Sequence, residues 1–382
     1  MKQSNLWIGG QHVEPSGGDY FDDINPSDQS VIAKVAKGSA SDIDKAVGAA
    51  KEAFQAFSRT QAKEREKVLC DAASIVERDK DEYLGLLIEE VGSPVMKAQF
   101  EVDYCINAFR AAAGVPRRLT GETMPLDRPG AFGMSVREPV GVIACITPFN
   151  VPLLKNVKQI AMVIATGNTS VLLPSEFATQ VTVKFAETLD EAGLPGGVFN
   201  YVTGDPFDIG DVLTSHPDVA AVNFCGSPVI GKRVAEIAAK DLKPITLELG
   251  GKSPLVVLDD ADLEKAIEAA TIGIFFFQGQ ACMASSRIIL QSGIAQSFID
   301  AFTDVARNIK VGDLSDPETA IGPIISERQA NRIRTHIDDA LDKGATLLHG
   351  GNEWKGQCCP PTILTNVKEG MTVFREETFG PV

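Results

Sequence analysis

Cys282 is the residue whose surroundings best suit a nucleophile. It lies in FQGQACMASSR (277–287), where glycine and small residues follow a long apolar stretch. Such a turn can expose a thiol, but a thiol is only a few per cent thiolate at neutral pH, so a base must accompany it. Most unpaired cysteines are small core residues, and we interpret Cys145 and Cys225, within apolar strands, in that way. Two adjacent cysteines, Cys358 and Cys359, are expected to lie in a loop.

Glu248 is the candidate base. It lies in LELGGK (247–252), a carboxylate within an apolar strand, where we expect burial to make it a useful base at neutral pH. The alternative is a structural ion pair with Lys252. All four histidines lie outside the candidate segments, which counts against a Cys-His or Ser-His hydrolase. They are His12, His216, His336 and His349.

Three further segments each follow a predicted strand: TPFN (147–150), PSE (174–176) and FCGS (224–227). A parallel sheet binds ligands beyond the carboxyl ends of its strands. Gly226-Ser227 comes directly before a helix, where free N–H groups can hold a pyrophosphate, although such a turn is more often only a turn. Glu176 can bind ribose hydroxyls and would repel a 2′-phosphate, or it can simply be a helix N-terminal charge.

Strands and helices alternate through the middle of the chain. This alternation predicts an α/β protein with a Rossmann-like parallel sheet covered by helices on both faces, followed by a second α/β domain. Gly250-Gly251 is a plausible hinge, so we expect a nucleotide-binding domain at 1–247 and a second domain at 248–382. The predicted strands are 142–146, 169–173, 198–202 and 219–224, and the helices are 152–167, 177–192, 207–214 and 228–240.

The first third of the sequence is expected to be mostly helical. Ser41–Asp44 is a candidate capping box for a helix that ends near Phe57. Further helices are predicted at 61–80 and 81–91, stopped by Gly-Ser-Pro. The glycines and prolines within 117–137 predict an exposed hairpin.

Composition excludes several functional classes. The chain has 382 residues, enough for two or three domains, and a net charge of −15, which disfavours nucleic acid and anionic membranes as partners. Seven cysteines without CxxC spacing indicate neither a disulfide framework nor a metal site. With no signal-peptide core and no apolar run of about 18 residues, we expect a reducing, cytoplasmic location.

Taken together, these motifs resemble the aldehyde dehydrogenase superfamily, most closely the benzaldehyde, vanillin and salicylaldehyde dehydrogenases. They occur in the family's order across nearly the whole chain, and the separation of base and nucleophile, 282 − 248 = 34 residues, also agrees. The matching segments are ITPFN (146–150), PSE (174–176), FCGS with Gly231, LELGGKSP (247–254), GQAC (279–282) and EETFGPV (376–382).

The resemblance implies a role for each matching residue. Cys282 would form a thiohemiacetal and then a thioester, Glu248 would be the base, the Asn150 amide would complete an oxyanion hole, and Lys158 would belong to a proton relay. NAD is favoured over NADP, because Glu176 is present and Leu173 replaces the family's lysine. Implied cofactor contacts are Ile146, Thr147, Pro148, Phe149, Ser175, Glu176, Gly226, Ser227, Gly231, Leu249, Glu377 and Phe379.

Family members continue beyond the motif that ends at Val382. The resemblance therefore implies a catalytic domain incomplete at its C-terminus, with Glu377 and Phe379 poorly held, and a chain that is not a competent enzyme by itself. A complete protein would be a homodimer or homotetramer, joined through the hairpin. The alternatives are a non-enzymatic NAD-binding or structural protein, and a Cys282-based esterase.

Overall fold

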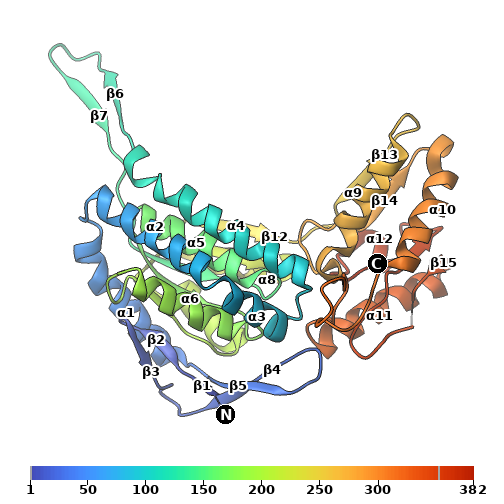
Figure 1. Cartoon of the computed structure of the whole chain (residues 1–382). Helices are drawn as coiled ribbons and strands as arrows, with labels where there is room; N and C mark the ends of the chain where they lie inside the picture. The colour runs from blue at the N-terminus through green and yellow to red at the C-terminus, as the bar shows by residue number, and fades with distance from the viewer. Residues whose placement is uncertain (1, 352) are drawn as a thin grey trace. The chain divides into compact units, whose positions relative to one another are not determined.

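The computed structural model describes residues 2–351 and 353–382, which form two compact units (Figure 1). The first unit comprises Met1–Asp23, Ile32–Tyr83 and Glu101–Glu248, and the second comprises Ile24–Val31, Leu84–Phe100 and Leu249–Val382. The main division falls between Glu248 and Leu249. Two short ranges from the N-terminal part of the chain also belong to the second unit. The expected division into 1–247 and 248–382 assigns both ranges to the first domain instead.

A seven-stranded sheet in the order β12-β11-β8-β9-β10-β2-β3 organises the first unit. The predicted Rossmann-like parallel arrangement is confirmed, since β8 pairs in parallel with both β9 and β11, and β9 with β10. Strands β8, β9 and β10 are almost fully buried, as expected for the centre of a sheet covered on both faces, whereas β11 is partly buried and β12 is largely exposed. The bounds are β8 Val142–Ile146, β9 Thr169–Leu173, β10 Phe199–Tyr201, β11 Val219–Gly226 and β12 Ile245–Leu249.

The strand order creates a switch point between β8 and β11. Right-handed crossovers place α5 and α6 on one face, where α2 packs over them, and α7 and α8 on the other face with α1. The helices that follow β8 and β11 therefore leave the sheet in opposite directions and open a crevice at the carboxyl ends of these strands. The helix bounds are α5 Pro152–Ala165, α6 Thr179–Glu191, α7 Pro206–Ser215 and α8 Pro228–Lys240.

The first third of the sequence was predicted to be mostly helical, but residues 2–36 contain no helix. They form five short strands, of which β2 (Leu6–Ile8) and β3 (Gln11–Val13) extend the main sheet in antiparallel fashion. Strands of three residues contain too little alternation to be recognised from sequence. The other strands, which form a separate three-stranded sheet, are β1 Lys2–Ser4, β4 Tyr20–Ile24 and β5 Val31–Ala36.

The predicted helices follow, with one correction at a cap. Helix α1 (Ala40–Phe57) ends where expected, but its cap is Ser39 and not Ser41. The Ser39 N–H donates to the Asp42 carboxylate at 3.0 Å, so the capping box begins two residues earlier than predicted. The next helices are α2 Ala62–Arg78, α3 Lys80–Val91 and α4 Val95–Ala113.

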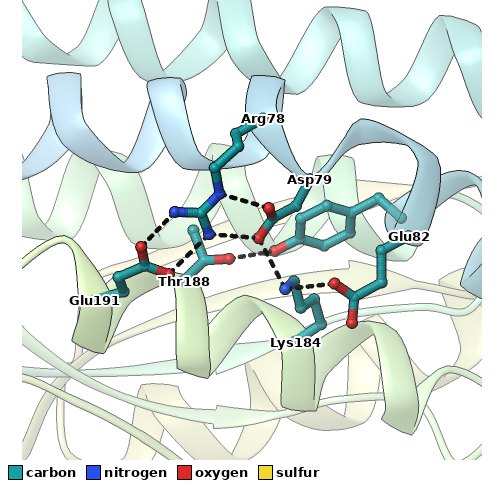
Figure 2. Close-up of polar contacts among 7 residues, drawn as sticks. Arg78, Asp79, Glu82, Lys184, Thr188 and Glu191 are labelled. Carbon is teal, nitrogen blue, oxygen red and sulfur yellow. Dashed lines mark hydrogen bonds and ion pairs between the residues drawn. The ribbon is translucent and has the colours of Figure 1, made fainter.

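A charge network joins the end of α2 and the start of α3 to α6 (Figure 2). Asp79 accepts from Arg78 Nε at 2.6 Å and from Lys184 Nζ at 2.8 Å, and Lys184 also reaches Glu82 at 2.6 Å. The hydrogen bonds and positive charges hold the pKa of Asp79 well below its usual range. Because Lys184 and Asp79 are largely shielded from solvent, the network fixes the helix layer on this face of the sheet.

The predicted hairpin is confirmed. Strands β6 (Glu122–Pro125) and β7 (Phe132–Ser135) pair in antiparallel register and extend beyond the helices of their unit (Figure 1). Its apolar side chains face solvent, among them Phe132 at 69% exposure and Met134 at 64%. Exposed apolar residues gathered on one hairpin are typical of a protein-protein contact.

The second unit has its own core. Parallel strands β13 (Pro254–Val257) and β14 (Arg287–Leu290) pack against α9 (Leu263–Phe275) and α10 (Ser292–Asn308), where Phe275 stacks on Phe302 at 5.6 Å between ring centroids. The remaining elements are the 3-10 helix η2 Phe276–Gly279, α11 Glu327–Asp342, β15 Thr346–His349, β16 Ile363–Thr365 and α12 Thr372–Arg375.

Candidate functional site

The register of the sheet brings the predicted strand-end segments to one edge. Ile146 is paired with both Leu173 and Phe224, so the segments that follow these residues start side by side. The Thr147 N–H donates to the Leu173 carbonyl at 3.1 Å, and its hydroxyl donates to Asn156 Oδ1 at 2.9 Å. This buried bridge to the following helix fixes the direction in which the chain leaves β8.

The Gly226-Ser227 turn provides an anion-binding geometry. Ser227 caps the 13-residue helix α8 and accepts from the Ile230 N–H at 3.4 Å. A Cβ atom on Gly226 would lie 2.7 Å from the tip of the Phe224 ring, so a larger residue here would displace that ring. Exposed N–H groups at a helix N-terminus favour a bound anion, and the sheet order places this terminus at the switch point.

The end of β9 carries Leu173 and, three residues later, Glu176. Leu173 occupies the position at which the family has lysine. Its side chain is only 1% exposed and packs into the core of the unit, where its Cδ2 lies 3.7 Å from the position of a Cβ on Gly210. Glu176 is partly exposed and receives a hydrogen bond from Ser175 at 3.4 Å.

Glu248 is less buried than predicted. Its side chain is 57% exposed at the end of β12, a strand at the edge of the sheet, where apolar neighbours cannot enclose it. The alternative prediction, a pair with Lys252, is also wrong, because the ion pair is with Lys155 of α5 at 3.2 Å. Lys252 instead lies near Arg287 and Glu377, and burial lowers its pKa to about 8.

Cys282 follows a strained backbone segment. Phe277, Gln278 and Gly279 have consecutive positive φ values of 49°, 54° and 67°. A left-handed conformation is ordinary for glycine but costs about 1–3 kcal/mol for each of the other two residues. All three residues are buried, whereas Cys282 itself is partly exposed.

Several contacts hold this segment in place. The Gln278 side-chain amide donates to the carbonyls of Gly92 at 2.9 Å and Pro323 at 3.0 Å, which joins three separate stretches of the second unit. The ammonium of buried Lys97 lies 4.1 Å from the centre of the Phe277 ring. Gly279 packs so closely on Gly380 that a Cβ would lie 2.2 Å from the Gly380 carbonyl oxygen.

The EETFGPV segment is also held, contrary to expectation. Gln329 of α11 donates to the Thr378 and Phe379 carbonyls, both at 2.9 Å, and Arg332 donates to the Glu377 carbonyl at 2.7 Å. Glu377 lies so close to Gly250 that a Cβ there would be 2.0 Å from its Oε2. Burial raises the pKa of Glu377 despite a hydrogen bond from the Gly251 backbone.

The other predicted residues fall into three classes of exposure. Lys158, Ser227 and Glu248 are exposed, and Thr147, Asn150 and Gly231 are buried. Partly exposed are Ile146, Pro148, Phe149, Ser175, Glu176, Gly226, Leu249, Cys282, Glu377 and Phe379. Phe149 meets Phe177 edge to face at 6.0 Å between ring centroids, so an aromatic contact links two of the strand-end segments.

The remaining thiols differ from Cys282. Cys105, Cys145, Cys225, Cys358 and Cys359 are buried, and Cys70 is exposed on α2. Burial raises the pKa of Cys145 to about 12 and also raises that of Cys359, so neither supplies a thiolate at neutral pH. Within 2–351 and 353–382, no group of three or more His, Cys, Asp or Glu side chains is arranged to hold a metal ion.

Some residues at the site were missed from sequence. His336 was placed outside every candidate segment, yet its Nδ1 lies 3.2 Å from Thr378 Oγ1, and burial lowers its pKa. Gln278 and Gln329 also escaped notice. Only Lys155 carried a signal, as a lysine among the apolar residues of helix 152–165. None of the helices in the described part of the chain has both the length and the apolar character to span a membrane.

The parallel sheet and the segments at the ends of its strands are those of one family of oxidoreductases. The aldehyde dehydrogenase family profile matches residues 12–382, and the chain belongs to that family. The predicted resemblance is therefore confirmed, and so is the class of reaction, the oxidation of an aldehyde.

Its individual relatives include enzymes named for aromatic aldehydes. The chain is 39% identical to vanillin dehydrogenase of Pseudomonas fluorescens over 380 residues, covering 99% of this chain and 78% of the relative. A solved salicylaldehyde dehydrogenase of Pseudomonas putida G7, complexed with salicylaldehyde, superposes with a TM-score of 0.97 at 36% identity, covering 100% and 79%. An NAD-dependent aldehyde dehydrogenase of Sinorhizobium meliloti gives a TM-score of 0.97 at 35% identity, covering 100% and 77%.

Proposed function

We propose that this protein oxidises an aldehyde to a carboxylic acid with NAD⁺, through a covalent adduct on Cys282. The observation that carries the proposal is the backbone before the thiol. Three consecutive left-handed residues are buried and fixed by the side chain of Gln278, and a partly exposed cysteine follows three residues after the last of them. Strain of this kind persists where the surrounding structure enforces it, and it is typical of functional sites.

The residues at the sheet edge fit a dinucleotide. The α8 N-terminus with Gly226 can hold the pyrophosphate, and the partly exposed Glu176 can accept hydrogen bonds from ribose hydroxyls. When bound, NAD⁺ supplies the acceptor for the hydride. Ile146, Thr147, Pro148, Phe149, Ser175, Ser227, Gly231 and Leu249 complete the proposed contacts on this side.

In the second unit, Glu377 and Phe379 are proposed to contact the nicotinamide end of the cofactor. Gln329 and Arg332 hold their backbone, and the close packing of Gly279 on Gly380 ties this segment to the loop that precedes Cys282. These contacts, all within the second unit, support a common site for the proposed nicotinamide contacts and the nucleophile. We accordingly propose nucleotide binding for the first unit and catalysis for the second.

The chain's own groups carry the proton transfers. Glu248 takes the proton of the Cys282 thiol and the sulfur adds to the aldehyde carbon, while the Asn150 amide and the Cys282 N–H stabilise the resulting oxyanion. Transfer of hydride to NAD⁺ leaves a thioester. Once Glu248 has released the first proton, it takes one from water, the hydroxyl adds to the thioester carbon, and the sulfur leaves as a thiolate. Lys158, exposed on the same helix as Lys155, would return protons to solvent.

Cofactor and substrate preferences follow from the same residues. Glu176 disfavours a 2′-phosphate, because two negative charges would meet in a partly desolvated site, so NAD is preferred over NADP. The relatives named for vanillin and salicylaldehyde favour an aromatic aldehyde, and Phe149 offers an aromatic surface at the sheet edge.

The test is an aldehyde oxidation assay with NAD⁺ and benzaldehyde, comparing Cys282→Ser with Cys70→Ser as the control thiol. We expect the first variant to lose oxidation below detection while it still binds NAD⁺, and the second to keep full activity. Ester hydrolysis without any aldehyde oxidation would favour the esterase alternative. NAD⁺ binding without turnover in the parent protein would favour a non-enzymatic role.

We further propose that the β6–β7 hairpin joins copies of the chain into a homodimer or homotetramer. The exposed Phe132 and Met134 support this, since isolated hairpins seldom present such side chains to water. Replacing both with serine should lower the mass measured by light scattering, and an unchanged mass would exclude the hairpin as the contact.

A further inference from the structure

Lys155 is a buried lysine near the N-terminus of α5, a position in which neither burial nor the helix dipole favours a positive charge. Its side chain is 8% exposed, and it lies in the first turns of α5, where its N–H donates to the Val151 carbonyl at 2.9 Å. A positive charge near a helix N-terminus is opposed by the helix dipole, and burying an ammonium group is costly. Neither helix formation nor apolar packing explains a lysine at this position.

The ion pair with Glu248 does explain it. Lys155 Nζ lies 3.2 Å from Glu248 Oε2, and both residues line a groove of about 320 Å³ between α5 and the strands β11 and β12. A second carboxylate, Glu101, meets the same turn of α5, where it accepts from the Leu154 N–H at 3.0 Å. The buried lysine thus brings positive charge to the end of β12, where Glu248 is otherwise half in solvent.

We propose that Lys155 is a positioning residue for Glu248, an inference that rests on the proposed role of Glu248 as the base. An exposed glutamate at the end of an edge strand has several rotamers of similar energy, and only some of them can meet a water molecule at the thioester. Lys155 selects among them by binding Oε2. The other oxygen, Oε1, is then the atom that takes the proton.

The position of Glu248 matters most when water cleaves the acyl enzyme. Attack of Cys282 on a carbonyl carbon, with Glu248 as the base, and departure of the leaving group form the acyl enzyme, and Glu248 is needed again for water to cleave it. A 4-nitrophenyl ester separates the two steps without any cofactor, because 4-nitrophenolate is released in a burst during acylation and then steadily as the acyl enzyme is hydrolysed. A variant that disturbs only the position of Glu248 should keep the amplitude of the burst and slow the steady phase.

The experiment compares Lys155→Met, Lys155→Arg and Glu248→Gln, the double variant Lys155→Met/Glu248→Gln, and Lys243→Met. Lys243 is a matched control, a buried lysine of the same unit whose ammonium donates to the Thr214 and His216 carbonyls at 2.9 and 2.7 Å. We expect Lys155→Met to slow the steady phase about 10-fold with an unchanged burst amplitude and little change in KM. Lys155→Arg should restore most of the rate, and the double variant should be no slower than Glu248→Gln alone.

The outcomes distinguish the positioning role of Lys155 from the base role of Glu248. Additive losses in the double variant, an equal loss in Lys243→Met, or no rescue by arginine would overturn the positioning role. A steady phase in Lys155→Met as fast as in the parent protein would do the same. Full hydrolysis in Glu248→Gln would instead refute the proposed base, and with it the basis of this inference. If Lys155→Met does not fold, the kinetics of Lys155→Arg and Lys155→Gln decide, since both keep a polar side chain at the groove.

Discussion

The proposed nucleophile and the proposed base are held in opposite ways. The backbone of 277–279 is strained, buried and fixed through Gln278, Lys97 and the packing on Gly380, so the position of Cys282 follows from the main chain. Glu248 lies at the end of an edge strand with an exposed side chain, and its ion pair is a side-chain contact to Lys155. The nucleophile is thus placed by backbone geometry and the base by a single electrostatic contact.

This difference suits the two tasks. The nucleophile forms and breaks a bond to carbon, and an error of about 1 Å at a reacting centre can cost roughly 100-fold in rate. The base exchanges its proton with water, so it benefits from a side chain that solvent can reach. Substitutions in the two regions should therefore differ in what they damage.

The largest effect is expected from Gly279→Ala. The new Cβ would lie 2.2 Å from the Gly380 carbonyl oxygen, so the loop before Cys282 and the 376–382 segment must separate. We expect aldehyde oxidation to fall by more than about 100-fold. Gly344→Ala is the matched control, with a similarly positive φ of 92° and no neighbour within 4 Å of its Cβ. If the two variants lose equal activity, backbone strain alone is responsible and the contact with Gly380 is irrelevant.

Gln278→Ala should have the next largest effect. It removes two hydrogen bonds and leaves the Gly92 and Pro323 carbonyls without this donor, at a cost of about 1–3 kcal/mol for each buried group. The left-handed segment should then relax, and both the melting temperature and the rate of Cys282 alkylation should change. Gln296→Ala, at an exposed position of α10, should change neither. Unaltered alkylation in Gln278→Ala would show that the loop is held by other contacts.

Glu248→Gln should leave stability almost unchanged. An exposed side chain contributes little to folding, and we expect a change within about 0.5 kcal/mol in chemical denaturation. Turnover should nevertheless fall, because an amide cannot take the proton. A clear loss of stability would mean that the Lys155 contact is structural, and that the contrast between the two regions is weaker than the exposure of Glu248 indicates.

The smallest effect concerns Lys252, beside Glu377 in the second unit. Its folded pKa of about 8 lies below the ordinary value of 10.5, so between these values the unfolded chain binds more protons. Stability should therefore rise with pH across this window, and the rise should vanish in Lys252→Met. Melting temperatures measured from pH 7.5 to 9.5 test this. Parallel curves for the two proteins would show that the lysine is not desolvated.

The sequence by itself determined the element order, the parallel sheet and the segments that gather at its edge. These features depend on local signals. Apolar strands alternate with helices, and Gly226-Ser227 precedes a helix start at Pro228, as predicted. Even the hairpin followed from its glycines and prolines. Short strands such as β2 and the true cap at Ser39 were missed, because a few residues carry too little pattern to fix their boundaries.

Only the tertiary structure decided how the site residues are held. Gln278 binds carbonyls 186 and 45 residues away, Lys155 reaches a carboxylate 93 residues away, and the His336 contact with Thr378 spans 42 residues. Burial was equally out of reach, since the apolar sequence around Glu248 indicated a buried residue while its edge strand leaves it exposed. Sequence patterns report on neighbours along the chain, whereas solvent exposure, backbone strain and ion pairing depend on which distant segments pack together.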